Sequence, residues 1–100
     1  MPSVAEILPM FPIPREGVAS RLVDGVAVAV TANDSTLHTF ENEVATEIWQ
    51  LADGRHSVAQ IVDRITEAFE VERPRAEKDV VDFVRLLDER GLVNLEVRPR

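Results

Sequence analysis

The hydrophobic pattern of this chain changes its period near residue 41, and that change constrains the fold more than any other feature. Before residue 41, β-branched and apolar residues follow the two-residue alternation of a strand; after it, they recur at helical spacing. Asp24-Gly25 separates two β-rich runs, Val18–Val23 and Val26–Thr31. A two-residue Asp-Gly connection is typical of a hairpin, because a type I′ turn requires positive φ angles.

A third strand is predicted directly after this hairpin. The segment 32–35 is rich in turn-forming residues, and Thr36–Phe40 follows it as a short β-rich run. The three strands therefore form an antiparallel meander. On the second strand the side chains of Val26, Val28 and Val30 share one face, and we expect that face to point toward the core.

Three helices and a last strand are predicted after residue 41. Asn42 is the expected N-cap of a first helix that ends at Asp53-Gly54, and Ser57 with Gln60 forms a capping box that opens a second. The third helix is expected from Arg75 to Arg90, after a connection broken by Pro74, and residues 92–97 form a short terminal strand. The order predicts an α+β fold, a winged helix-turn-helix with a three-stranded antiparallel β-meander followed by three helices and a short C-terminal strand.

The first 17 residues are expected to form a separate arm. Four of the six prolines lie there, and proline fixes φ and removes a hydrogen-bond donor. We therefore predict an extended arm without a helix over residues 1–17, with the folded domain at 18–97. A chain of 100 residues has the size of one domain.

Composition excludes several classes of partner and chemistry. The chain has no Cys, which excludes disulfides and thiolate metal sites, and no apolar run long enough to span a bilayer. No segment has the pattern of a signal peptide, so a cytoplasmic location is expected. With 18 acidic against 11 basic residues the net charge is −7, which argues against nucleic acid or an anionic membrane as a partner.

The inventory of catalytic groups is thin. His38 and His56 are the only histidines, and neither has a second His at helical spacing, so no metal site is expected. No nucleophile motif, phosphate-binding loop or dinucleotide fingerprint occurs. We therefore expect no catalytic residue, no cofactor and no enzymatic activity from this chain alone.

Two features favour a binding surface. The apolar residues of the third helix cover a wider arc than one buried face needs, either because the helix faces a partner or because a small domain buries it on two sides. The strand Thr36–Phe40 has no Lys, Pro or Gly to block pairing at a sheet edge, so it could accept an added peptide strand.

An ordered set of motifs resembles PqqD-like proteins over about residues 15–97. The segment Phe40–Gly54 resembles that family's strand-to-helix junction, with an Ile-Trp pair and a closing Asp-Gly. Arg55–Val58 and Ile61-Val62 continue the pattern, Asp79-Val80 resembles the family's Asp-Val pair in the third helix, and Leu86–Val93 resembles its ending. The Pro-Glu of the quinone-pathway members is missing from the second and third strands, which favours another peptide pathway.

The resemblance implies a non-catalytic adaptor that binds the leader of a ribosomal precursor peptide by strand addition and presents it to a modifying enzyme, often a radical S-adenosylmethionine enzyme. The third strand and third helix would flank the peptide. A winged-helix transcriptional regulator and a structural subunit of an enzyme complex stay open as alternatives, as does a homodimer. The expected peptide-binding residues are Thr36, Leu37, His38, Thr39, Phe40, Val81, Val84, Arg85, Leu87 and Asp88.

Overall fold

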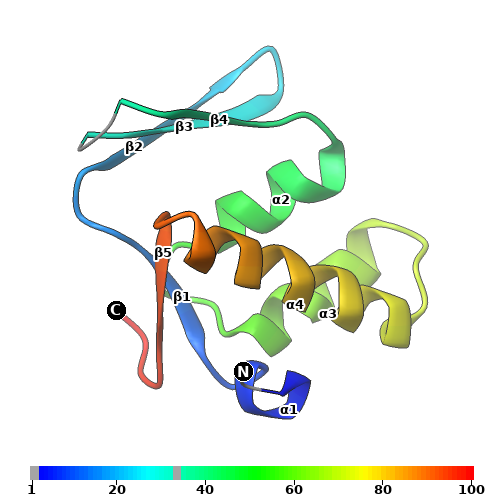
Figure 1. Ribbon diagram of the computed structural model, residues 1–100. Helices are drawn as coiled ribbons and strands as arrows, with labels where there is room; N and C mark the ends of the chain where they lie inside the picture. The colour runs from blue at the N-terminus through cyan, green and yellow to red at the C-terminus, as the bar shows by residue number, and fades with distance from the viewer. Residues whose placement is uncertain (1–2, 33–34) are drawn as a thin grey trace.

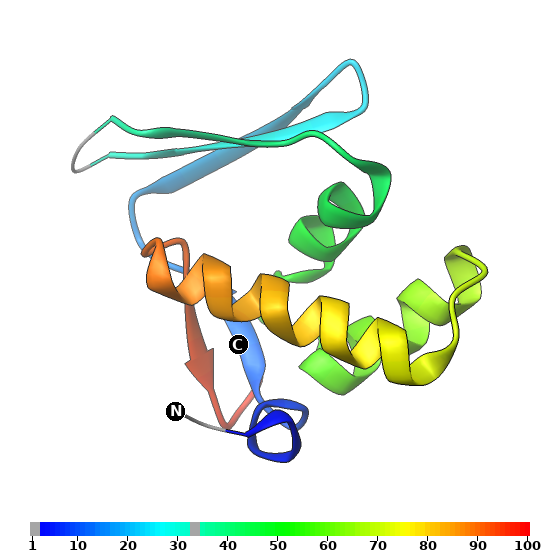
Figure 2. The same ribbon diagram turned by 45° about the vertical axis from the view of Figure 1, so that its right-hand side comes forward.

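A computed structural model describes residues 3–32 and 35–100 of the protein (Figure 1). A three-stranded sheet forms one layer, with α2 beneath it and the α3–α4 pair beyond (Figures 1 and 2). A second sheet of two strands, formed by segments near the two ends of the chain, lies beside the helices. The predicted α+β fold with its meander is confirmed. In chain order the elements are α1 (Val4–Ile7), β1 (Phe11–Pro14), β2 (Val18–Val23), β3 (Val26–Thr31), β4 (Leu37–Phe40), α2 (Glu43–Leu51), α3 (Val58–Ala68), α4 (Arg73–Glu89) and β5 (Val93–Glu96).

The strands of the meander have the order β2-β3-β4, and both neighbouring pairs are antiparallel. Two turns connect them. The first is the predicted hairpin turn, in which Asp24 and Gly25 have φ angles of 51° and 80°. Positive φ at both turn positions matches the right-handed twist of the flanking strands. The second connection was predicted at residues 32–35, and its centre, residues 33–34, lies outside the described part of the chain.

The helix starts follow the capping residues. The Asn42 side chain accepts a hydrogen bond from the Ala45 N–H at 2.7 Å, and Ser57 and Gln60 form the complete capping box of α3. The start of α4 differs from the prediction, because Pro74 stands inside its first turn instead of in the connection before it. A proline is tolerated there, since the first N–H groups of a helix have no partner within it.

The predicted inner face of β3 is wrong. Ala27 and Ala29 are the buried residues of this strand, and Val30 on the other face is 38% exposed. Ala27 and Ala29 belong to the same core cluster as Trp49 and Phe40, so the large aromatic side chains fill the layer between sheet and helices. Small residues fit opposite them, and the valines are left on the outer face of the sheet.

The N-terminal arm is also not the extended, helix-free segment that was predicted. Ser3 caps a short helix, α1, by accepting a hydrogen bond from the Glu6 N–H, and Ile7 at its end is only 1% exposed. After Pro9 the chain becomes extended, and β1 pairs with β5 from Phe11 opposite Glu96 to Pro14 opposite Val93. The prolines allow this because a two-stranded ribbon leaves one edge of β1 free of ladder bonds.

Two groups of buried side chains form the core. One joins Ile7 to the facing sides of α2, α3 and α4. The other joins the inner face of the meander to α2, α4 and β5 through Phe40, Trp49 and Leu87. The meander is therefore held to the helices by the second group, beside which the candidate site lies.

Candidate functional site

The free edge of β4 presents a defined set of backbone groups. Val23 and Val26 flank a two-residue turn and so exchange both of their hydrogen bonds. Because hydrogen-bonding direction alternates along a strand, Ala29 then faces β4, where it lies opposite His38. The backbone groups of His38 thus point toward β3, whereas those of Leu37 and Thr39 point outward, in position to pair with an added strand.

Phe40, the last residue of β4, fixes this edge against the helices. Its carbonyl accepts a hydrogen bond from the Thr46 hydroxyl at 2.8 Å, and the same hydroxyl accepts one from the Ala27 N–H at 3.3 Å. Its ring lies 5.2 Å from the ring of Trp49 on α2 and 5.5 Å from that of Phe83 on α4, between centroids. Aromatic pairs at these distances add to the stabilisation that burial gives, so the end of β4 is held against α2 and α4.

A hollow of about 250 Å³ opens between the start of α2 and the middle of α4, and Phe83 in its wall contacts Phe40 at the end of β4. Val44 and Phe83 are half-buried in its wall, so part of each side chain faces the opening. Asn42 and Asp79 provide polar groups at the same opening. An apolar side chain of a peptide lying on β4 would find a matching surface there.

The residues predicted on α4 lie in different environments. Val81 and Val84 are 0% exposed and Leu87 is 1% exposed, so these three side chains belong to the core and present no surface to a ligand. Arg85 and Asp88 are half-buried. The sequence left two explanations for the wide apolar arc of this helix, a partner or burial on two sides within the domain. At Val81 the structure supports burial within the domain.

Ion pairs occupy most of the charged side chains along α4. Asp88 lies 3.3 Å from Arg15, whose guanidinium also donates to the backbone carbonyls of Asp88 and Val93. The exposed Lys78 hydrogen-bonds to Asp82 at 2.8 Å, and this bond raises the pKa of the Lys78 ammonium. Most charges along α4 are thus balanced by a partner of opposite sign, in contrast to the strongly negative chain as a whole.

The two histidines lie in different parts of the fold. His38 stands on the inner face of β4, and His56 lies 3.0 Å from Asp53 in the turn between α2 and α3. Burial raises the pKa of Asp53, but hydrogen bonds from the Arg55 N–H and from His56 outweigh it and hold that pKa below its usual value. Within residues 3–32 and 35–100, no three His, Asp or Glu side chains are grouped so that they could bind a metal ion.

Sequence reasoning missed two residues of the hollow. Helical spacing predicts core positions for Val44 and Phe83, and both side chains do touch the core. What the pattern did not show is that both side chains are only half-buried and line a hollow between α2 and α4. An aromatic residue at the margin of an apolar stripe was the available signal.

The fold and site together define a winged-helix domain in which a free strand edge adjoins an apolar hollow. The chain belongs to the PqqD family, described as coenzyme PQQ synthesis protein D, whose family model matches residues 41–93. That match spans α2, α3 and α4 and ends at the first residue of β5. No curated protein matches the chain.

Two solved structures are similar to this one over most of their length. TbiB1, solved in complex with the TbiA(beta) leader peptide, is 29% identical with a TM-score of 0.74, and the similarity covers 82% of this chain and 94% of that one. A lasso peptide synthetase B1, solved with its leader peptide, is 26% identical with a TM-score of 0.72, covering 84% and 98%. The predicted family and winged-helix fold are thereby confirmed.

No helix in the described part of the chain combines the length and apolar character that crossing a membrane requires.

Proposed function

We propose that this protein is a non-catalytic adaptor that binds the leader region of a ribosomal precursor peptide and presents it to a modifying enzyme. The observation that carries the proposal is the similarity to two structures solved with leader peptides, together with the free β4 edge beside an apolar hollow. Precursors of this kind are made on ribosomes, so the adaptor would act in the cytoplasm.

The leader would add to the sheet as a strand along Thr36–Phe40. Its backbone would pair with the outward groups of Leu37 and Thr39, which gives orientation with little sequence preference. Selectivity would come from an apolar leader side chain in the hollow beside Val44 and Phe83. Val81, Val84 and Leu87 would support this surface from the core instead of touching the peptide.

The enzyme served is the second part of the proposal. Both structural neighbours are B1 proteins by the names they carry, and one is a lasso peptide synthetase component. That likeness favours a lasso-type precursor over a substrate of a radical S-adenosylmethionine enzyme. Arg85 and the Arg15–Asp88 pair lie farther along α4 and would affect encounter rate and register more than affinity.

The test is a titration of the full chain with the leader of the precursor peptide encoded beside it, followed by backbone amide NMR. We expect shifts at Leu37, Thr39 and Phe83 and saturable binding that the Thr39→Pro variant weakens at least tenfold. A leader that leaves β4 and Phe83 unshifted would refute the proposal. Salt-sensitive binding of duplex DNA in place of the leader would favour a transcriptional regulator.

A further inference from the structure

The opposite edge of the meander borders a second groove. In the described part of the chain β2 pairs only with β3, so no strand covers its outer edge, although the Val18 N–H at its start donates to the Arg15 carbonyl. By the same alternation that fixes the β4 edge, the backbone groups of Ser20 and Leu22 point away from β3. The strand contains no Pro, Gly or Lys that would hinder pairing at this edge.

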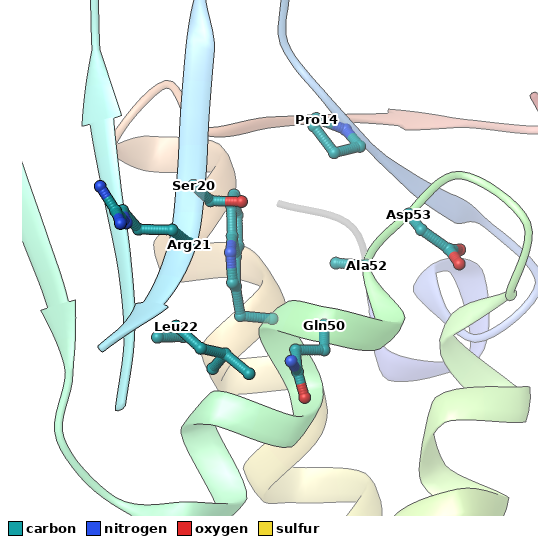
Figure 3. A pocket seen from close by; sticks show the side chains of 9 residues that line it. Pro14, Ser20, Arg21, Leu22, Gln50, Ala52 and Asp53 are labelled. Carbon is teal, nitrogen blue, oxygen red and sulfur yellow. The ribbon is translucent and has the colours of Figure 1, made fainter. Parts of the chain in front are cut away.

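A hollow of about 360 Å³ lies directly beside this edge, between β2, the second half of α2 and the end of β1 (Figure 3). Leu22 extends toward Gln50 across the opening, while Arg21 points away from α2 (Figure 3). Leu22 and the half-buried Pro14 supply the apolar surface at the opening, while the buried Trp49, Ala27 and Ala52 line the bottom of the hollow. Leu22 is 50% exposed although it is a large apolar residue, which leaves much of its side chain available to a ligand.

The hollow continues toward the hairpin tip. A second cavity of about 300 Å³ shares Leu22 and Gln50 with the first and ends beside Gly25. Its wall includes Glu43 and Glu47, one helical turn apart on α2, and neither takes part in an ion pair found among residues 3–32 and 35–100. Together the two hollows form a groove along β2 and α2, with Leu22 and Trp49 in its apolar part and Glu43 and Glu47 at the end near the hairpin tip.

This groove shares no residue with the hollow at the end of β4, and the two lie at opposite edges of the sheet. A leader peptide on β4 leaves it open. An adaptor that delivers a bound peptide has to contact its enzyme through a surface that the peptide does not cover. The β2 edge meets that requirement.

We propose that the groove between β2 and α2 binds an extended segment of the partner enzyme, added to β2 as a strand, with an apolar side chain over Trp49 and a Lys or Arg near Glu43 and Glu47. The strand edge, the apolar hollow and the unpaired carboxylates each select one part of that chemistry. This inference goes beyond leader binding but rests on the adaptor role. The net charge of −7 disfavours a second copy of the chain as the occupant.

The probe is the heptapeptide acetyl-KTLTVTK-amide, whose Lys, Leu and Val side chains lie on one face of a strand in either direction. We expect saturable amide shifts at Ser20, Leu22 and Glu47, a shift of the Trp49 indole, and none at Thr39. The counterpart with Glu in place of both Lys should bind at least tenfold more weakly. Equal binding of the two peptides, or shifts confined to β4, would overturn the proposal.

The Ser20→Pro variant removes an outward N–H and should weaken the heptapeptide at least tenfold while leader binding stays unchanged. Ser20→Ala keeps the N–H and is the matched control, expected to bind the heptapeptide normally. Thr39→Pro should weaken leader binding and leave heptapeptide binding unchanged. The two variants therefore distinguish a failure of the β2 proposal from a failure of the leader-binding proposal. A dimer in sedimentation that Ser20→Pro dissociates would assign the edge to a second copy and refute an enzyme segment.

Discussion

The rings of Phe40 and Phe83 meet edge to face, with their centroids 5.5 Å apart and their planes at 78°. This contact joins the last residue of β4 to the middle of α4, so the two elements expected to flank a leader peptide are held at a fixed separation. Phe83 also lines the hollow between α2 and α4. It therefore supports the fold and also lines the hollow that we propose for a leader side chain.

Replacing Phe83 separates these roles. We expect Phe83→Ala to weaken leader binding at least tenfold and to lower the free energy of unfolding by about 2 kcal/mol, less than for a fully buried Phe. Phe83→Leu keeps apolar volume and should restore most of the stability. Calorimetric titration with the leader and urea denaturation measure the two effects. Unchanged leader affinity in the folded Ala variant would remove Phe83 from the site.

Proline substitutions at adjacent positions test the direction of the backbone groups on β4. Thr39→Pro removes an outward N–H, so we expect a folded protein with leader affinity reduced at least tenfold. His38→Pro removes an N–H directed at Ala29 on β3 and should destabilise the meander instead. Amide NMR of both variants and leader titration of each provide the comparison. The opposite result, with His38→Pro folded and Thr39→Pro unfolded, would show that the register is shifted by one residue.

The sequence indicates the elements well but not which faces are buried. Strands and helix caps follow from local pattern, as with Asp24-Gly25, Asn42 and Ser57. The buried face of β3 does not, because Val and Ala alternate along it and either set could point inward. The space left beside Phe40 and Trp49 determines which face of β3 is buried, and these two residues belong to other elements.

Long-range contacts explain two other features that the sequence did not show, the pairing of β1 with β5 and the burial of Val81. The partner of β5 is β1, about 80 residues earlier, and no local signal links Phe11 to Glu96. Val81 is likewise buried although it lies off the main stripe of α4, because the core group that includes it is drawn from four helices. The β4 edge could be found because the absence of blocking residues is a local property.

The N-terminal arm tests how far those long-range contacts stabilise the domain. Sequence alone predicts that residues 1–14 are dispensable, whereas the structure places Ile7 in the core and uses the carbonyls of Leu8 and Met10 as acceptors for the first N–H groups of α3. We now expect a chain that starts at Arg15 to lose about 5 kcal/mol, most of the stability of a small domain. Cooperative unfolding within a few degrees of the full chain would contradict this.

A matched pair of point variants supports the same prediction. Ile7→Ala should cost about 3 kcal/mol, because Ile7 is fully buried. Val4→Ala, one turn earlier on α1 at a position 37% exposed, should cost less than about 0.5 kcal/mol. Thermal and urea denaturation distinguish the two.

Thr46 is the one polar residue buried in the described part of the chain, and its hydroxyl bridges β3 and β4. Thr46→Val keeps the shape but leaves the Phe40 carbonyl and the Ala27 N–H without that partner. We expect a loss of about 2 kcal/mol in unfolding free energy and faster hydrogen exchange at Ala27. Thr66→Val is the control, since the Thr66 hydroxyl bonds to the Asp63 carbonyl at the surface and its loss should cost little.

Two glycines with the same backbone conformation should respond differently to alanine. Gly54 and Gly25 have φ angles of 85° and 80°, so either substitution puts a side chain in the left-handed region at a cost of about 1–2 kcal/mol. At Gly25 nothing lies within 4 Å of the added Cβ, whereas at Gly54 it would lie 2.8 Å from Arg100 Cβ and 3.1 Å from Ile13 Cγ1.

We therefore expect Gly54→Ala to lower the unfolding free energy by more than Gly25→Ala, with the excess caused by displacement of Arg100 and Ile13. Urea denaturation gives the two free energies, and amide NMR should show the Gly54→Ala perturbation spreading into β1. Because the Gly54 N–H donates to the Pro12 carbonyl, that displacement also strains the β1–β5 ribbon. Equal losses for the two variants would mean that the chain end moves aside freely and that the ribbon does not depend on Gly54.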